Sequence, residues 1–115
     1  MVRLWKAFLN TLAGFHWALR HERAVQEETA ALVLGLPLSF FVAQNAGWWL
    51  AMIGSLLILL IVELLNTAIE KLSDHVTPGH HQTIKLVKDL GSAAVFFALT
   101  LAVLTWGAAL VVRFA

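Results

Sequence analysis

The feature that most constrains the fold is a run of 34 residues without a charged side chain, from Thr29 to Val62. As a single α-helix this run would be roughly 50 Å long, whereas the hydrocarbon core of a bilayer is about 30 Å thick. One straight helix therefore does not fit a membrane, and we expect the run to break into two spans. The segment Gln44–Gly47 (QNAG) is the expected turn, with Gly47 supplying a left-handed backbone conformation.

A second uncharged run, of 23 residues, follows Asp89. Of the 115 residues 60% are hydrophobic and 13% are charged, which is more apolar surface than a soluble domain of this size can bury. We therefore expect one all-α integral-membrane domain over residues 1–115, whose first span is short and kinked at Pro37. The three spans are expected at about residues 28–43, 48–72 and 85–112. The net charge of +1 indicates no nucleic-acid partner.

The first twenty residues carry a helical pattern of their own. Apolar side chains at positions 5, 8, 12, 15 and 19 share one stripe, with cations such as Arg3 and Lys6 on the opposite side. This pattern predicts an amphipathic helix over about residues 2–20 that lies in the membrane interface. An amphipathic helix packed on a protein core is the alternative. The polar segment 20–28 (RHERAVQEE) marks the boundary before the first span, and 74–83 (DHVTPGHHQT) is an expected loop.

The charged residues are distributed very unequally between the two membrane sides. Three spans put the N-terminal segment and the 74–83 loop on one side, together with seven of the eight Lys and Arg residues and all seven acidic residues. Only Arg113 falls on the other side. The positive-inside rule then predicts a cytoplasmic N-terminus and a function at the cytoplasmic face.

Four polar side chains share one face of the second expected span. Glu63, Asn66, Glu70 and Asp74 fall within about an 80° arc at helical spacing. Carboxylates are costly in hydrocarbon, so this face is expected to meet another helix, a cation or a water-filled cleft. The alternative is that these carboxylates lie at a helix end in water, which explains Asp74 well and Glu63 poorly. We therefore expect a functional role for Glu63.

Further ionisable residues gather at the ends of the other spans, namely Glu22, Glu27, Glu28, Lys88 and Asp89. Clustered carboxylates with a nearby cation suit Mg²⁺ and substrate phosphates, because Mg²⁺ takes few protein ligands and keeps several waters. Solvated helix ends explain the same residues equally well at this stage. The sequence contains no GxxxxGK[ST], GxGxxG or soluble-kinase motif. The adjacent His80 and His81 are expected to be solvated rather than to bind a metal.

Two segments resemble the signature of the prokaryotic diacylglycerol kinase family: VELLNTAIEKLSDH (62–75) and KLVKDLGSAAV (85–95). The resemblance implies an integral-membrane homotrimer of the bacterial inner membrane that transfers the γ-phosphate of MgATP to a lipid alcohol. With diacylglycerol as the acceptor, the products are phosphatidic acid and ADP. Because three short spans cannot enclose both substrates, we expect active sites shared between subunits.

The resemblance also implies roles for individual residues. Glu63 is similar to the general base that takes the proton of the lipid hydroxyl, and Glu22 and Glu70 are similar to the magnesium ligands. Asn66 and Lys88 complete the implied catalytic set. The implied ATP contacts are Arg3, Asn10, Glu22, Glu70, His80, His81, Lys88 and Asp89. The implied lipid contacts are Arg3, Glu28, Glu63 and Ser92.

The chain departs from the family pattern at a few positions. Asn10 stands where the family has a tyrosine, VQEE (25–28) replaces FRQE, and Gly79 replaces an acidic residue.

Three alternatives to a diacylglycerol kinase remain. An undecaprenol kinase of the same fold also phosphorylates a primary hydroxyl; the segments HERAVQEE and NTAIEKLSDH look closer to the diacylglycerol branch. A small proton-coupled transporter subunit would also use intramembrane carboxylates, but the outer half of the bundle has no ionisable group to complete a path. A purely structural membrane oligomer would leave Glu63 and Asn66 without a role.

Overall fold

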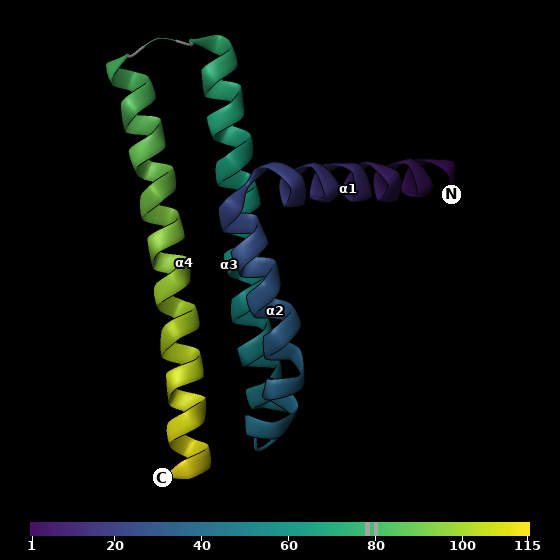
Figure 1. Cartoon of the computed structure of the whole chain (residues 1–115), viewed down its shortest axis with the longest axis vertical. Helices are drawn as coiled ribbons and strands as arrows, with labels where there is room; N and C mark the ends of the chain where they lie inside the picture. The colour runs from purple at the N-terminus through teal and green to yellow at the C-terminus, as the bar shows by residue number, and fades with distance from the viewer. Residues whose placement is uncertain (78, 80) are drawn as a thin grey trace.

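The structure is a computed structural model that describes residues 1–77, 79 and 81–115; Pro78 and His80 lie outside the described residues. It consists of four helices in chain order: α1 (Val2–His21), α2 (Arg23–Val42), α3 (Ala46–Val76) and α4 (Gln82–Phe114). The helices α2, α3 and α4 lie side by side, whereas α1 projects sideways from them (Figure 1). Each of these three is long and apolar enough to cross a membrane, which confirms the prediction of three spans.

The long uncharged run is interrupted where the sequence predicts, but a different residue from the expected one makes the turn. The side chain of Asn45 accepts a hydrogen bond from the Trp48 backbone N–H at 3.0 Å and so caps α3. Ala43 and Asn45 both have extended backbones. Gly47 lies inside α3, and none of the described glycines has a positive φ. The expected left-handed glycine is therefore wrong: an asparagine cap on an extended backbone makes the turn.

The other boundaries show helices that are longer than expected. Glu22 alone separates α1 from α2, so most of the polar segment 20–28 is helical. The loop predicted at 74–83 is also too long, because α3 continues through Asp74 to Val76 and α4 begins at Gln82. No Pro or Gly precedes position 78 in this part of the sequence, so polar side chains alone do not end α3. Pro37 lies inside α2, and its expected kink stays a prediction.

Close contacts join the three long helices. The indole Nε1 of Trp106 on α4 donates to the backbone carbonyl of Met52 on α3 at 3.0 Å. Gly35 on α2 faces this contact: a Cβ there would lie 2.9 Å from Leu56 Cδ1 and 3.2 Å from the Trp106 ring. Small residues let membrane helices approach in this way. Gln44 Nε2 donates to the Val112 carbonyl at 3.0 Å and ties the α2–α3 turn to the end of α4.

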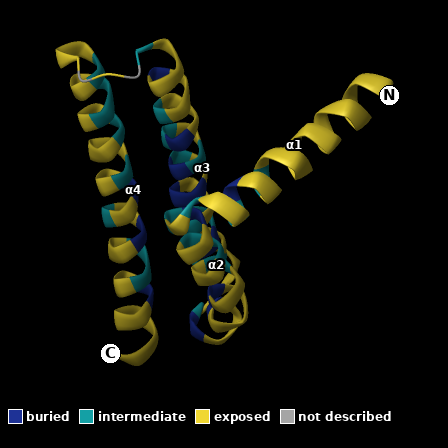
Figure 2. Ribbon diagram, turned by 45° about the horizontal axis from the view of Figure 1, so that its top comes forward, coloured by how far each residue is buried: buried dark blue, intermediate teal, exposed yellow. Residues whose placement is uncertain are grey.

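The outward faces of α2, α3 and α4 are strongly apolar, and most of α4 is exposed (Figure 2). Their large exposed side chains include Phe40, Phe41, Leu50, Phe97, Val103 and Leu104. A surface of this kind suits lipid chains or neighbouring protein rather than water. The chain is therefore a membrane protein, as its composition predicts.

Candidate active site

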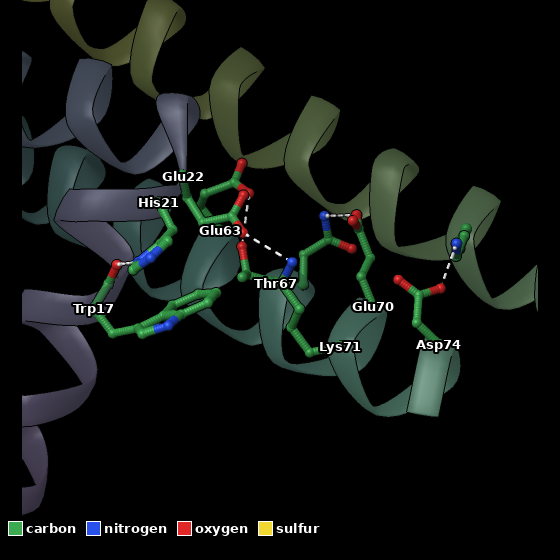
Figure 3. A network of polar contacts seen from close by, with 10 residues as sticks. Trp17, His21, Glu22, Glu63, Thr67, Glu70, Lys71 and Asp74 are labelled. Carbon is green, nitrogen blue, oxygen red and sulfur yellow. Dashed lines mark hydrogen bonds and ion pairs between the residues drawn. The ribbon is translucent and has the colours of Figure 1, made fainter. Parts of the chain in front are cut away.

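The site is built on the polar face of α3. Glu63 is only 8% exposed, and Thr67 Oγ1 donates to its Oε2 at 3.4 Å (Figure 3). One turn further on, Asn66 Nδ2 donates to Glu70 Oε1 at 3.0 Å. Glu63 thus points into the protein and has a protein partner, as the cost of a lipid-exposed carboxylate requires.

Two carboxylates from outside α3 approach Glu63. Glu28 on α2 is close enough to Glu63 for their charges to interact, and Oε1 of Glu28 is buried without a hydrogen-bond partner in the described part of the chain. Glu22, between α1 and α2, and Glu70 lie near enough to act on Glu63 by their charge. The sequence predicted each of these four residues as a site residue. The structure brings them together because α2 packs along α3.

The carboxylates around Glu63 are suited to a metal ion whose remaining ligands are waters and phosphate oxygens. Among the residues that the structure describes, no group of three or more His, Asp or Glu side chains is arranged to hold a metal ion. Glu22 instead pairs with Lys71 Nζ at 3.4 Å. Oδ1 of Asn66 is buried against Gly91 on α4 and has no hydrogen-bond partner among the described residues. Mg²⁺ needs only one or two protein carboxylates when waters and phosphates complete its shell. The carboxylate oxygens of Glu22 and Glu70 have the chemistry that such a metal requires.

The predicted cationic side chain comes from α4. Lys88 Nζ lies 2.9 Å from Asp74 Oδ1 and so meets the outer end of the polar face of α3. Asp89, the next residue, pairs with Lys85 Nζ at 2.7 Å on an exposed part of α4. Lys88 is thus next to the site, whereas Asp89 has a partner on its own helix.

The remaining predicted site residues are scattered. Arg3 lies near the N-terminal end of α1, far from the polar face of α3 (Figure 1). Asn10 lies nearer, on the wall of a groove between α1 and α3. His81 caps α4 by accepting a hydrogen bond from the Thr83 N–H at 3.1 Å. Ser92 is exposed on α4, and His80 lies outside the described residues. Among the described residues of this set, none forms a hydrogen bond or an ion pair with Glu63.

The groove between α1 and α3 has a volume of about 580 Å³. Its walls are mostly apolar, and they are formed by Asn10, Thr11, Gly14, Phe15, Trp17, Ala18, Leu64, Thr67, Ala68 and Lys71. Thr67 lies on the groove wall and donates a hydrogen bond to Glu63, so one side chain separates the groove from the buried carboxylate. Sequence reasoning missed Thr67 and Lys71, although they follow Glu63 by four and eight residues and so share its side of the helix.

Comparison with known proteins identifies relatives over almost the whole chain. The family model for prokaryotic diacylglycerol kinase matches residues 9–110. The diacylglycerol kinase of Pseudomonas aeruginosa is 41% identical over 90% of this chain and 85% of the relative. The diacylglycerol kinase of Escherichia coli K12 is 34% identical over 82% of this chain and 81% of the relative. The undecaprenol kinase of Bacillus subtilis is 38% identical over 81% of this chain and 76% of the relative.

Proposed function

The chain belongs to the prokaryotic diacylglycerol kinase family, and from this premise we propose how its site works. It is an ATP-dependent diacylglycerol kinase, which transfers the γ-phosphate of ATP to the primary hydroxyl of diacylglycerol and gives phosphatidic acid and ADP. The observation that supports this most directly is the position of Glu63. Thr67, which lines the apolar groove, donates to this buried carboxylate, and Glu22, Glu28 and Glu70 lie around it.

The lipid acceptor enters from the groove between α1 and α3. Its acyl part contacts apolar side chains such as Phe15 and Leu64, and its hydroxyl reaches Glu63 beside Thr67. Glu63 acts as the general base that takes the hydroxyl proton as the oxygen attacks the γ-phosphate. Glu28, which approaches Glu63, completes the lipid side of the site.

The nucleotide binds at the water-side end of the same helix face. Glu22 and Glu70 hold Mg²⁺, which when bound spreads the charge of the phosphate oxygens. Asn66 orients Glu70 through the hydrogen bond from its Nδ2, and Lys88 adds positive charge near the phosphates. Phosphoryl transfer depends mainly on such positioning and charge stabilisation. The further ATP contacts that we propose are Arg3, Asn10, His80, His81 and Asp89.

Several of these residues act in trans. In one chain Arg3 lies in the first turn of α1, at the end that points away from the other helices, and Ser92 is exposed on α4. Most of the apolar surface of α4 is exposed as well. We therefore propose a homotrimer in the bacterial inner membrane, with sites shared between neighbouring subunits. Residues 1–115 form its single domain, α1 lies in the interface as an amphipathic helix, and the N-terminus is cytoplasmic.

Undecaprenol kinase is the second candidate function, because the B. subtilis relative of that name is 38% identical to the chain. A long polyprenol also presents a primary hydroxyl to Glu63. The proposed groove accepts the end of either lipid, so only turnover distinguishes them. The transporter alternative loses its support, since the comparisons identify kinases.

The test measures transfer of labelled phosphate from ATP to lipid by the purified protein in bilayers. Diacylglycerol and undecaprenol are offered separately, with and without Mg²⁺. Glu63→Gln keeps the shape of the side chain and is expected to lower kcat by on the order of a hundredfold or more. Glu27→Gln is the matched control, because Glu27 is exposed and its ion pair among the described residues is with Arg23, at 3.7 Å. Full turnover of Glu63→Gln would contradict the assignment of the base.

A further inference from the structure

Lys71 is a charged residue for which the proposed chemistry has no role. It projects from α3 towards the junction of α1 and α2 (Figure 3). Its Nζ lies 3.4 Å from Glu22 Oε1 and 5.4 Å from the centre of the Trp17 ring. Trp17 belongs to α1 and Glu22 connects α1 to α2, so one ammonium group contacts both segments.

The ring that Lys71 contacts is itself held in place. The indole of Trp17 stacks on the imidazole of His21 with 4.5 Å between ring centres and an angle of 18° between the planes. The Nδ1 of His21 lies 2.8 Å from the Trp17 carbonyl oxygen. A fixed aromatic face of this kind attracts a cation through the electron density of its ring. The contact between Lys71 and Trp17 therefore joins α3 to a defined surface of α1.

The rest of α1 makes few contacts that would fix its direction. Residues 1–14 are all exposed, and Ala18 is the buried residue of this helix. Ala18 packs with Val25 and Leu60 near the junction, at the inner end of α1. Within one chain α1 is held at its inner end, and its distance from α3 sets the width of the groove. Lys71 and Trp17 both lie on the groove wall, at the point where they hold the two helices together.

We propose that Lys71 is a positioning residue that holds α1 over the lipid groove by its contacts with Glu22 and Trp17. This inference rests on the proposed function, in which the groove receives the acceptor lipid. Lys71 touches neither the reacting hydroxyl nor Glu63; it acts through the helix that covers the groove. Because Glu22 is also a proposed magnesium ligand, metal and ammonium compete for one carboxylate. Binding of the metal nucleotide therefore weakens one of the two contacts that hold α1.

The kinetic test compares three variants. Lys71→Met keeps an unbranched side chain and removes its charge, while Lys71→Arg keeps the charge. Arg23→Met is the matched control, because it removes one positive charge at the same junction from an exposed pair with Glu27. Lys71→Met is expected to raise KM for the lipid roughly fivefold, since it loses both an ion pair and a cation–π contact. The KM for MgATP is expected to fall about twofold in Lys71→Met, because the competing ammonium no longer holds Glu22. The kcat at saturating lipid stays close to that of Arg23→Met, and Lys71→Arg restores most of the lipid KM.

A fluorescence measurement reports the position of α1 without turnover. The chain has no cysteine, so Ala68→Cys introduces a unique site for a bimane label on the groove wall opposite Trp17. Tryptophan quenches bimane on contact, and the same label with Trp17→Phe gives the unquenched reference. Lys71→Met is expected to lose most of the quenching by Trp17, whereas Arg23→Met and Lys71→Arg keep it. Adding Mg²⁺ with a non-hydrolysable ATP analogue lowers the quenching in the unsubstituted protein and changes it little in Lys71→Met.

The proposal is overturned if Lys71→Met matches Arg23→Met either in quenching or in lipid KM. A loss of quenching without a rise in lipid KM overturns it as well, because the helix would then move without affecting the lipid. Circular dichroism and size-exclusion chromatography identify a variant that fails to fold, and Lys71→Arg then provides the comparison. Failure of the proposed function is separate: the unsubstituted protein would phosphorylate neither lipid, while the quenching difference would still be measured.

Discussion

Gly35 lies where α2 comes close to both α3 and α4, and an added methyl group there has a calculable effect. A Cβ at this position would lie 2.9 Å from Leu56 Cδ1 and 3.2 Å from two ring atoms of Trp106, while ordinary Cβ contacts lie at 3.4–4 Å. The Trp106 ring cannot simply turn away, because its Nε1 donates to the Met52 carbonyl at 3.0 Å. Gly35→Ala therefore strains the packing or breaks this hydrogen bond.

The two routes have similar costs. Overpacking by one methyl group costs about 1–3 kcal/mol, and an interhelical hydrogen bond in a membrane contributes about 0.6–1.7 kcal/mol. Replacing glycine by alanine also favours the helix by up to about 1 kcal/mol. Gly107→Ala in α4 receives this gain alone, since nothing lies within 4 Å of a Cβ there. The free energy of unfolding of Gly35→Ala should therefore lie about 1–3 kcal/mol below that of Gly107→Ala.

The assay is reversible unfolding in mixed micelles, followed by circular dichroism as the denaturing detergent is increased. Gly54→Ala is a second control, because a Cβ there also has no neighbour within 4 Å. In a Trp106→Phe background the smaller ring leaves room, and Gly35→Ala should then cost less than about 0.5 kcal/mol relative to its controls. Equal stabilities of Gly35→Ala and Gly107→Ala, or the same cost in both backgrounds, would refute the reasoning.

Two further predictions test the metal ligands and the turn. Asn66→Ala removes the donor that orients Glu70, so Mn²⁺ should bind roughly tenfold more weakly in the presence of an ATP analogue. Electron paramagnetic resonance measures this affinity, and a value equal to that of Glu27→Gln would contradict the role of Asn66. Asn45→Ala removes the cap of α3 and should lower the free energy of unfolding by about 1 kcal/mol. Asn45→Ser keeps a capping oxygen, so its free energy of unfolding should fall by less. Equal decreases for the two variants in the micelle unfolding assay would mean that the cap contributes nothing.

Most of the helical framework could be predicted because charge is so costly in hydrocarbon. The uncharged runs before Glu63 and after Asp89 predicted α2, α3 and α4, and helical spacing put Glu63, Asn66 and Glu70 on one face. These features depend on one helix at a time. Composition and periodicity along the chain were therefore enough to find them.

The features that sequence reasoning missed depend on how segments pack against one another. The left-handed conformation expected at Gly47 was wrong because the Asn45 side chain caps α3 instead. The groove beside Thr67 exists because α1 leaves the bundle at a particular angle, and no local pattern sets that angle. Lys71 received no individual interpretation from the sequence, because Trp17 and Glu22, which it contacts, lie about fifty residues away along the chain.

The elbow between α1 and α2 is a single residue, Glu22, with extended backbone angles of φ −117° and ψ 115°. Because each helical residue advances the direction of side chains by about 100°, one inserted or deleted residue here would roll α1 about its axis. Trp17 would then turn away from the groove, and the Glu22 carboxylate would leave its place beside Glu63. The same residue thus sets the direction of α1 and carries a proposed ligand of the metal. A change in chain length at this point would therefore alter both at once.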